Sequence, residues 1–532
     1  MCVSKEAASF PIYVPRGTDV AWDIIAKSDK FLVYFDPDID GLFAGILGEV
    51  FLTNLNEYLI KIGSERRISY DSYMNSNRRH GFTLSDEQVK EIQGRTVLAV
   101  DFAISPDDMR RLVDSGVNIV NIDHHEINLK NIFYYESEKV MEDGSVQKFR
   151  GITLNNQYHF EPERFRFLSG AGMVYYALSA AVPSFATEEN KAMVGMTLLS
   201  DIREIEGDDA REFLKATFRN NSPRFRYYID MTKDAKDYEF GVANMDRNFV
   251  DYKFAPKINA LFRLNKNRDA MDIARMQAPE EMRKDLNVFR EMQKAIIDII
   301  HNNISCSEKK GLYIGIINKE EMDALMPYAN VELTNFVGVA CSRVRDNFGK
   351  TTLLFVMDAD GKILRGSVRG KFDNVDYLDI FRKHGLKCDG HKVAFGVNSL
   401  TLKDVNLDAL SNAIIEAEQY GEVHQFDGRI QHCQNLALWN MGHGEFFAVN
   451  NNFLRDSKRV LVRYEGPKES VKCTEHFNKE KGKVTYWTYD IDGIIVKAFE
   501  ENMTPFNCLL LPIASHTRGE NGYVQYYLRR PN

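Results

Sequence analysis

The chain has 532 residues, 44% of them hydrophobic and 27% charged, and its formal net charge is −8. This composition is ordinary for a globular protein, and the negative charge argues against a protein that binds nucleic acid through its bulk charge, although it leaves room for a local basic groove. The length predicts about three or four domains. The seven cysteines form no CxxC pair, which favours a reducing cytoplasm over a disulfide framework or a zinc ribbon. We expect no membrane partner, because no signal peptide and no membrane-spanning run is visible.

Three hydrophobic runs in the N-terminal half end in aspartate, and a segment with helix signals follows each of them. They are Phe31–Phe35 before Asp36, Asp38 and Asp40; Thr96–Val100 before Asp101; and Val117–Ile122 before Asp123. Alternating strands and helices predict a parallel sheet, and ligands of such sheets bind beyond the carboxyl ends of the strands. We therefore expect the acidic side chains to meet at one edge.

Burying such a cluster of carboxylates without cations would be costly. One aspartate after a strand is usually a turn former or a helix cap, so the prediction rests on the whole set. His124 follows the third strand, and Asp201 follows a predicted helix over Glu188–Leu199. Oxygen ligands with an imidazole suit Mn²⁺ or Mg²⁺ better than Zn²⁺. Two such ions about 4 Å apart would favour hydrolysis of a phosphoester.

The C-terminal half predicts three further parts. A charged amphipathic stretch, Pro279–Asn303, is typical of a long connecting helix, and the last stretch from Gly421 is rich in strands and turns, as in a small β-barrel or sandwich. Between them, three runs predict strands of a second α/β lobe: Leu312–Ile317, Val337–Ser342 and Thr351–Met357. The expected divisions are a catalytic domain (1–278), a connecting helix (279–305), a substrate-binding domain (306–416) and a β-rich domain (417–532).

The N-terminal motifs resemble a known family. Asp38-Ile39-Asp40-Gly41, Asp101, Asp123-His124-His125 and Asp201 are similar, in order, to the four motifs of the DHH phosphoesterases. The segment Pro256–Leu264 resembles one that is found in RecJ exonucleases, with Asn259 and Arg263 at matching positions. Many family members have a histidine where this chain has Tyr34, so the resemblance implies a first metal that binds loosely or only when substrate arrives, with partial compensation from Asp36.

The second lobe carries two more matching motifs. Asp389–Gly396 resembles the glycine-rich histidine loop of the DHH-associated domain, and Ser367-Val368-Arg369 resembles that domain's Ser-x-Arg strand. The resemblance implies that a terminal phosphate is held by Ser367, Arg369, Gly390 and His391. It further implies backbone contacts by Asn259 and Arg263, and by Arg78 and Arg79, which lie near the position of a phosphate-contacting arginine in RecJ.

Taken together, the resemblance implies a two-lobe α/β phosphoesterase core with two Mn²⁺ or Mg²⁺ ions. The expected activity is exonuclease digestion of single-stranded DNA from the 5′ end, in a setting such as DNA repair or recombination, with a single-strand-binding protein or a helicase as a partner. His125 would orient or protonate the scissile phosphate, and Asp123 would shape the site. Two alternatives stay open: a phosphodiesterase for short RNA or cyclic dinucleotides, and a non-catalytic DNA-binding scaffold.

Overall fold

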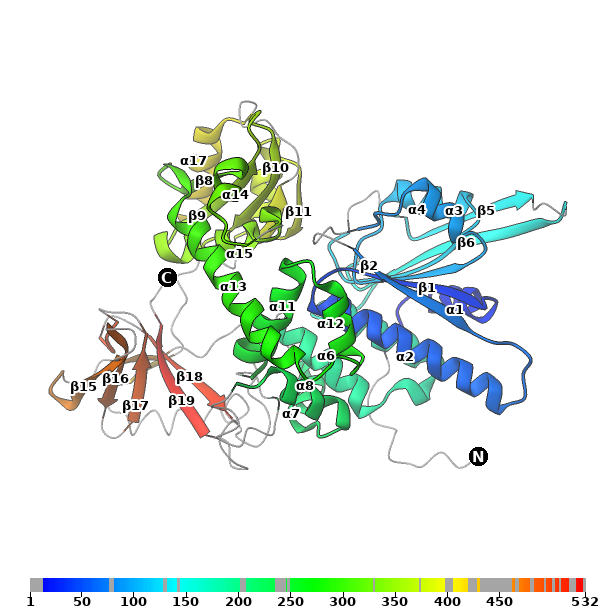
Figure 1. Ribbon diagram of the computed structural model, residues 1–532, viewed down its shortest axis with the longest axis horizontal. Coiled ribbons are helices and arrows are strands. Elements are labelled where there is room, and N and C mark those ends of the chain that lie inside the picture. Colours follow the sequence, from blue (N-terminus) through cyan, green and yellow to red (C-terminus); the bar gives the residue numbers. More distant parts are fainter. Residues whose placement is uncertain are drawn as a thin grey trace. The chain divides into compact units, whose positions relative to one another are not determined.

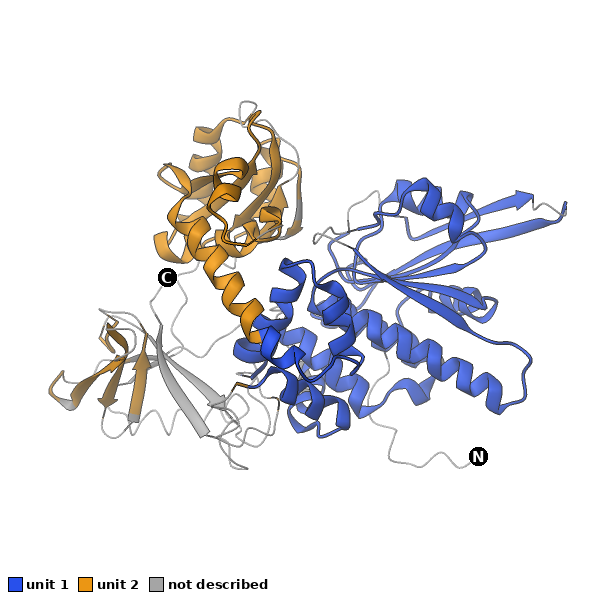
Figure 2. Cartoon of the chain, in the orientation of Figure 1, with its two compact units in different colours: residues 1–233, 249–286 blue, residues 234–248, 287–532 orange. Residues whose placement is uncertain are grey.

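The computed structural model describes most of the first 419 residues and parts of the remainder. The described ranges are 13–75, 81–127, 132–140, 144–200, 207–234, 245, 249–328, 331–372, 375–397, 405–419, 428–430, 462–464, 468–478, 483–491, 494–499, 503–506, 509–515 and 523–529. The chain divides into two compact units, unit 1 of residues 1–233 and 249–286 and unit 2 of residues 234–248 and 287–532 (Figure 2). The division falls within one long helix, α13 (Met282–Asn302).

Unit 1 is built on a six-stranded sheet with the strand order β2-β1-β3-β4-β6-β5 (Figure 1). The strands are β1 (Lys30–Phe35), β2 (Ser69–Met74), β3 (Thr96–Val100), β4 (Asn118–Asp123), β5 (Tyr134–Val140) and β6 (Val146–Asn155). All neighbours pair in parallel except β5, which is antiparallel to β6. The predicted parallel sheet is therefore confirmed, with one antiparallel strand at its edge.

Helices cover both faces of this sheet, which explains why β1 and β3 are apolar without alternation. The helices of unit 1 are α1 (Thr18–Ala26), α2 (Ile39–Lys61), α3 (Asp86–Glu91), α4 (Pro106–Asp114), α5 (Gly170–Ala181), α6 (Glu188–Ser200), α7 (Gly207–Arg219), α8 (Pro223–Thr232), α11 (Ala255–Arg263) and α12 (Asn267–Ala274). Short helical turns lie at η2 (Glu163–Phe165), η3 (Pro183–Phe185) and η4 (Val250–Phe254). Helices α3 and α4 share a core with one face of the sheet, and α2 and α5 pack on the strands as well as on each other.

Unit 2 contains a second six-stranded sheet with the order β11-β12-β10-β9-β8-β7. Its strands are β7 (Ser305–Glu308), β8 (Leu312–Asn318), β9 (Thr351–Met357), β10 (Ile363–Arg369), β11 (Cys388–His391) and β12 (Ala394–Val397), and its helical elements are α14 (Lys319–Leu325), η5 (Leu333–Asn335), α15 (Val337–Phe348), α16 (Tyr377–Lys383) and α17 (Leu407–Gln419). Strands β8 and β9 are parallel and the other pairs are antiparallel. The predicted second α/β lobe is therefore confirmed, and its sheet is mixed.

One predicted strand of this lobe is wrong. Val337–Ser342 opens helix α15, although its β-branched residues favour a strand. The helix buries Val337, Ala340, Cys341 and Val344 and contacts β9 and β10. This spacing of three and four residues places the apolar side chains on one helical face, so burial against the sheet overrides the local propensity.

The C-terminal part forms a seven-stranded sheet with the order β13-β14-β18-β19-β17-β16-β15, which confirms the predicted β-rich region. Its strands are β13 (Gly428–Ile430), β14 (Val462–Tyr464), β15 (Val471–Asn478), β16 (Lys483–Ile491), β17 (Ile494–Ala498), β18 (Leu509–Ser515) and β19 (Tyr523–Arg529), with a short turn η7 (Lys468–Ser470). Within the described ranges, no helix is long and apolar enough to cross a membrane.

Candidate metal centre

The register of the parallel strands brings four polar residues to one level of the sheet edge. Phe35 pairs with Val100, and Val100 pairs with Ile122 in the next strand. Asp123 pairs with Asn155 at the end of β6. The residues that follow or end these strands are Asp36, Asp101, Asp123 and Asn155. The sequence therefore predicted correctly that strand-end carboxylates gather at the carboxyl edge.

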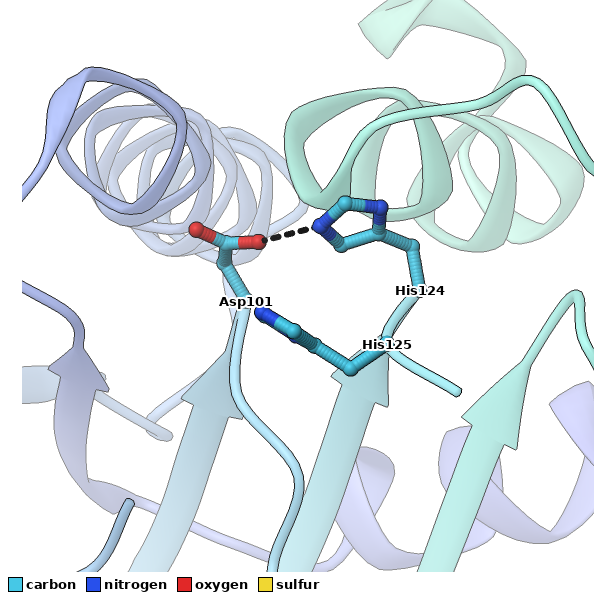
Figure 3. Close-up of side chains that lie close together, drawn as sticks. All are labelled: Asp101, His124 and His125. Carbon is cyan, nitrogen blue, oxygen red and sulfur yellow. Dashed lines mark ion pairs between the residues drawn. The ribbon is translucent and has the colours of Figure 1, made fainter. Parts of the chain in front are cut away.

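His124 is buried and lies beside the carboxylates of Asp101 and Asp40, and Figure 3 shows its pairing with Asp101. Its Nε2 atom is 3.1 Å from Oδ1 of Asp101 and 3.6 Å from Oδ2 of Asp40. The three side chains are at most 4% exposed. They come from α2, from the end of β3 and from the end of β4, so the fold assembles them from distant parts of the sequence.

Asp123 holds the second histidine. Its Oδ1 atom lies 2.8 Å from Nδ1 of His125, and its Oδ2 atom accepts a 3.1 Å hydrogen bond from Nδ2 of Asn155. The same Asn155 amide donates to the main-chain carbonyl of His125 at 3.0 Å. The His125 ring is 30% exposed, in contrast to the buried His124. Asn155 therefore fixes both members of the pair, a role that the sequence analysis did not foresee.

The N-terminus of α5 anchors Asp40. The backbone amides of Gly170 and Ala171 donate to its two carboxylate oxygens at 2.7 and 3.0 Å. Ser169 caps the helix by accepting from the Gly172 amide, and its hydroxyl lies 2.7 Å from that of Thr197 in α6. Burial raises the pKa of the Asp40 carboxyl, and the two amides oppose this shift. A helix N-terminus stabilises an anion, which accounts for a buried carboxylate at this position.

Asp36 and Asp38 begin the loop between β1 and α2. Asp38 is the N-cap of α2, and its Oδ1 accepts a 2.9 Å hydrogen bond from the Gly41 amide. Asp36 is buried and accepts a 3.4 Å hydrogen bond from Nδ2 of Asn75. A side chain at Gly41 would place Cβ 2.4 Å from the Asp36 carbonyl oxygen, so this tight loop requires glycine.

Tyr34 stands where the resemblance drawn from the sequence leads us to expect a histidine. Its hydroxyl donates to Oδ1 of Asn75 and accepts a 2.9 Å hydrogen bond from the Thr83 amide. Burial raises the pKa of this phenol to about 12, so it stays a donor at neutral pH. Because Asn75 also contacts Asp36, Tyr34 belongs to the hydrogen-bond network that supports Asp36.

The donor set fits a divalent cation. Asp101, His124 and His125 each offer one ligand atom, and the three atoms lie within 4.8 Å of one another. Asp40 adds a carboxylate beside His124. Carboxylate oxygens and imidazole nitrogens are ligands of Mn²⁺ and, for the oxygens, of Mg²⁺. Three predicted site residues, Asp201, Arg78 and Arg79, lie outside the described residues.

Asn259 and Arg263 lie one turn apart on α11, half-buried, and α11 contacts α2. Lys257, two residues before Asn259, is fully buried, and its ammonium group donates to the main-chain carbonyl of Thr232 at 2.5 Å. That carbonyl belongs to the last residue of α8, where the helix dipole favours a cation. Lys257 therefore caps the C-terminal end of a neighbouring helix.

In unit 2, a separate cationic group forms around β10. Nη1 of Arg369 donates to Oγ of Ser367 at 2.8 Å, and its Nε donates to Oγ of Ser342 at 3.1 Å. A Cβ atom at Gly338 would lie 2.9 Å from Nη2 of the same guanidinium. Ser342 and Gly338 belong to α15, so the wrong strand prediction concealed both.

The predicted glycine-rich loop is a tight hairpin between β11 and β12. Gly390 has φ of 140°, a conformation that side chains disfavour. Ala394 pairs with His391 on one side and with Arg369 on the other, so the backbones of the two predicted phosphate ligands share one row of the sheet. The sequence motifs are thus brought together by strand pairing.

Comparison with known proteins finds likeness at the level of structure. No protein-family model matches the chain, and no curated protein matches it. The chain is similar to the crystal structure of RecJ from Thermus thermophilus in complex with Mn²⁺, with 14% identity and a TM-score of 0.62 over 99% of this chain and 72% of that one. The Mg²⁺ complex from the same source gives 13% identity and a TM-score of 0.57 over 99% and 73%. The chain therefore has a RecJ-like fold.

Proposed function

We propose that this protein is a metal-dependent exonuclease that hydrolyses phosphodiester bonds of single-stranded DNA from the 5′ end. The observation that carries the proposal is the buried group of Asp40, Asp101 and His124 at the carboxyl edge of a parallel sheet. A fold alone does not determine a reaction. The RecJ-like fold adds support, because the similar crystal structures are complexes with Mn²⁺ and Mg²⁺.

Two Mn²⁺ or Mg²⁺ ions would be held by carboxylates and one imidazole. The proposed ligands are Asp36, Asp38, Asp40, Asp101, His124 and Asp201. When bound, such ions make a water molecule nucleophilic at neutral pH and offset the charge of the phosphate. The structure supports the assignment through its donor chemistry, since oxygens from Asp40 and Asp101 lie 3.6 and 3.1 Å from the His124 nitrogen.

His125 would orient the scissile phosphate or donate a proton to its leaving oxygen, with Asp123 as the partner of its ring. The carboxylate of Asp123 accepts the Nδ1 proton of His125, which leaves Nε2 to carry or release a second proton. The ring is 30% exposed, so a substrate can reach it. Asp123 thereby stabilises the protonated ring and sets its orientation, a task separate from direct contact with substrate.

The cationic group of unit 2 would bind the terminal phosphate. Arg369 offers a planar set of donors that suits phosphate oxygens, and Ser367 adds a hydroxyl beside it. Gly390 and His391 would complete the site from the hairpin, whereas Asn259, Arg263, Arg78 and Arg79 would contact the strand's other phosphates. We propose a single-strand-binding protein or a helicase as a partner that would present such a substrate.

The test is digestion of single-stranded DNA and RNA of graded length, labelled at either end, with Mn²⁺ or with EDTA. We expect Mn²⁺-dependent release of the 5′ label as a mononucleotide from long DNA, and loss of this release in Asp123→Ala. Early release of the 3′ label would reverse the direction. A sharp preference for very short RNA or for cyclic dinucleotides would favour the small-substrate phosphodiesterase instead. No hydrolysis of any nucleic acid by the folded protein would overturn the proposal.

A further inference from the structure

The backbone of Asp101 adopts an unusual conformation. Its φ is 62°, in the left-handed region, which residues with a side chain seldom occupy. Its amide donates to the main-chain carbonyl of Ile122 at 2.9 Å, so the turn remains attached to β4 after β3 has ended. This conformation aims the carboxylate across the sheet edge toward His124.

A buried amide from the neighbouring strand holds this turn. Asn121 in β4 is fully buried, and its Nδ2 donates to the main-chain carbonyl of Ala99 at 3.3 Å and to that of Phe102 at 3.0 Å. These carbonyls lie on either side of Asp101 in the sequence. The side-chain amide has two N–H groups, and the two bonds use both of them. Asn121 therefore holds the chain two residues before and one residue after the left-handed residue.

Neighbouring residues leave the carboxylate of Asp101 little room to move. Gly170, at the start of α5, lies directly against the Asp101 side chain, and a Cβ atom there would be 2.2 Å from Oδ1 of Asp101 and 2.6 Å from its Cγ. On its other side the same oxygen lies 3.1 Å from His124. A small rotation of the turn would move the carboxylate either into α5 or away from the imidazole.

We infer that Asn121 is a positioning residue, which fixes the left-handed turn at Asp101 and thereby sets the carboxylate for the bound cation. The expected effect on cation binding rests on the proposed function, whereas the expected effect on the conformation of Asp101 concerns the backbone alone. Asn121 is fully buried among apolar residues of a central strand. Polar atoms in such an environment require hydrogen-bond partners, so a buried asparagine there indicates a specific structural role. The Nδ2 atom of Asn121 finds its partners in the two carbonyls that bracket the metal ligand, whereas its Oδ1 has no hydrogen-bond partner among the described residues.

The test compares Asn121→Leu, which keeps the branched shape of the side chain and its number of heavy atoms and removes both donors, with Thr153→Val as a matched control. Thr153 lies in β6 and pairs directly with Asn121 of β4. It is buried, and its hydroxyl has no hydrogen-bond partner among the described residues. Asn121→Ser is the milder second variant, in case Asn121→Leu does not fold. Mn²⁺ affinity is measured by calorimetry and by the electron paramagnetic resonance spectrum, and the φ angle of Asp101 by crystallography.

We expect Asn121→Leu to weaken Mn²⁺ binding by roughly 10- to 100-fold, as for other residues that orient a metal ligand, and to change the Mn²⁺ spectrum. We expect kcat to fall while the KM for DNA changes little, and Thr153→Val to match the wild type. Wild-type Mn²⁺ affinity in both folded Asn121 variants would overturn the inference. If the wild type itself binds no Mn²⁺, the proposed function fails. The inference about Asn121 is then tested by the crystal structures of its variants. An Asp101 φ angle that stays near its left-handed value without Asn121 would overturn that inference.

Discussion

The acidic cluster of unit 1 and the cationic group of unit 2 are built in opposite ways. In unit 1, Asp40, Asp101 and His124 come from three separate elements and are nearly inaccessible. In unit 2, Ser367 and Arg369 lie two residues apart on one strand, and the guanidinium is half-buried. The carboxylates are fixed by backbone amides and by neighbouring side chains, which suits a cation with strict ligand geometry. The arginine presents a planar fork of donors, a geometry that matches the oxygens of a phosphate group.

The largest effect is expected for Asp101→Asn, which removes one charge from the acidic cluster and keeps the shape of the side chain. Asparagine also tolerates the left-handed conformation, so the backbone should stay in place. Mn²⁺-dependent cleavage should fall by roughly 10²–10³-fold, the range for losing one key electrostatic group. Single-turnover digestion measures this loss, and thermal unfolding of the metal-free protein should show no loss of stability.

The control for that variant is Asp107→Asn on α4, where the side chain is 99% exposed and pairs with Arg110 on the surface. It should cleave DNA at the wild-type rate. Equal losses in both variants would mean that net charge, and not the buried site, governs the activity.

The next effect in size is expected for Gly170→Ala. The new Cβ atom would lie 2.2 Å from Oδ1 of Asp101, so either the carboxylate or α5 must shift. Such overpacking costs about 1–3 kcal/mol of stability, and the displaced ligand should lower cleavage by roughly tenfold or more. Denaturant unfolding and Mn²⁺ titration measure the two parts. Gly172→Ala is the matched control, because its nearest atom is the flexible end of Leu168 at 3.1 Å; equal damage in the two variants would refute the role of Gly170.

A smaller effect, of a different kind, is expected in unit 2. Arg369→Ala removes the guanidinium that contacts Ser367 and Ser342. Losing a charge-assisted contact with a phosphate should raise the KM for 5′-phosphorylated DNA roughly tenfold, while kcat and Mn²⁺ affinity stay near wild type. Lys362→Ala, which removes an exposed charge just before the same strand, should leave the KM unchanged. A fall in kcat without a change in KM would contradict the division between the two regions.

The smallest effect is expected for Tyr34→Phe, which removes the hydroxyl from the network that supports Asp36. The side-chain carbonyl of Asn75 and the backbone amide of Thr83 would each lose a buried partner, at a cost of about 1–2 kcal/mol of stability. Because Asn75 stands between the phenol and Asp36 in this network, Mn²⁺ affinity should change by less than about threefold, as measured by calorimetry. A larger loss of affinity would mean that Tyr34 acts on the metal site directly.

The sequence predicted the acidic cluster because its signal is local. Each of β1, β3 and β4 is a short apolar run that ends at an aspartate, and the geometry of parallel sheets then brings these ends to one edge. The residues that support the cluster carry no such signal. Asn121, Asn155 and Gly170 acquire their roles only through the register of neighbouring strands and the approach of α5, which depend on contacts between distant parts of the chain.

In unit 2, one residue of the cationic group was missed for the same reason. Ser367 and Arg369 are two residues apart and were predicted together, whereas Ser342 was missed because the segment that contains it was predicted as a strand. Only the sheet that α15 covers reveals its helical spacing of buried residues. Local propensity therefore identified the strand side of this group and missed the helical side.

The most direct test of the acidic cluster is anomalous diffraction at the manganese edge from crystals soaked in Mn²⁺. The account predicts a peak at coordination distance from both the Asp101 carboxylate and the His124 imidazole, with a second peak nearby that shares a carboxylate with the first. Strong peaks elsewhere and none beside this pair, in crystals that diffract well, would contradict the claim that the buried carboxylates exist to hold metal ions.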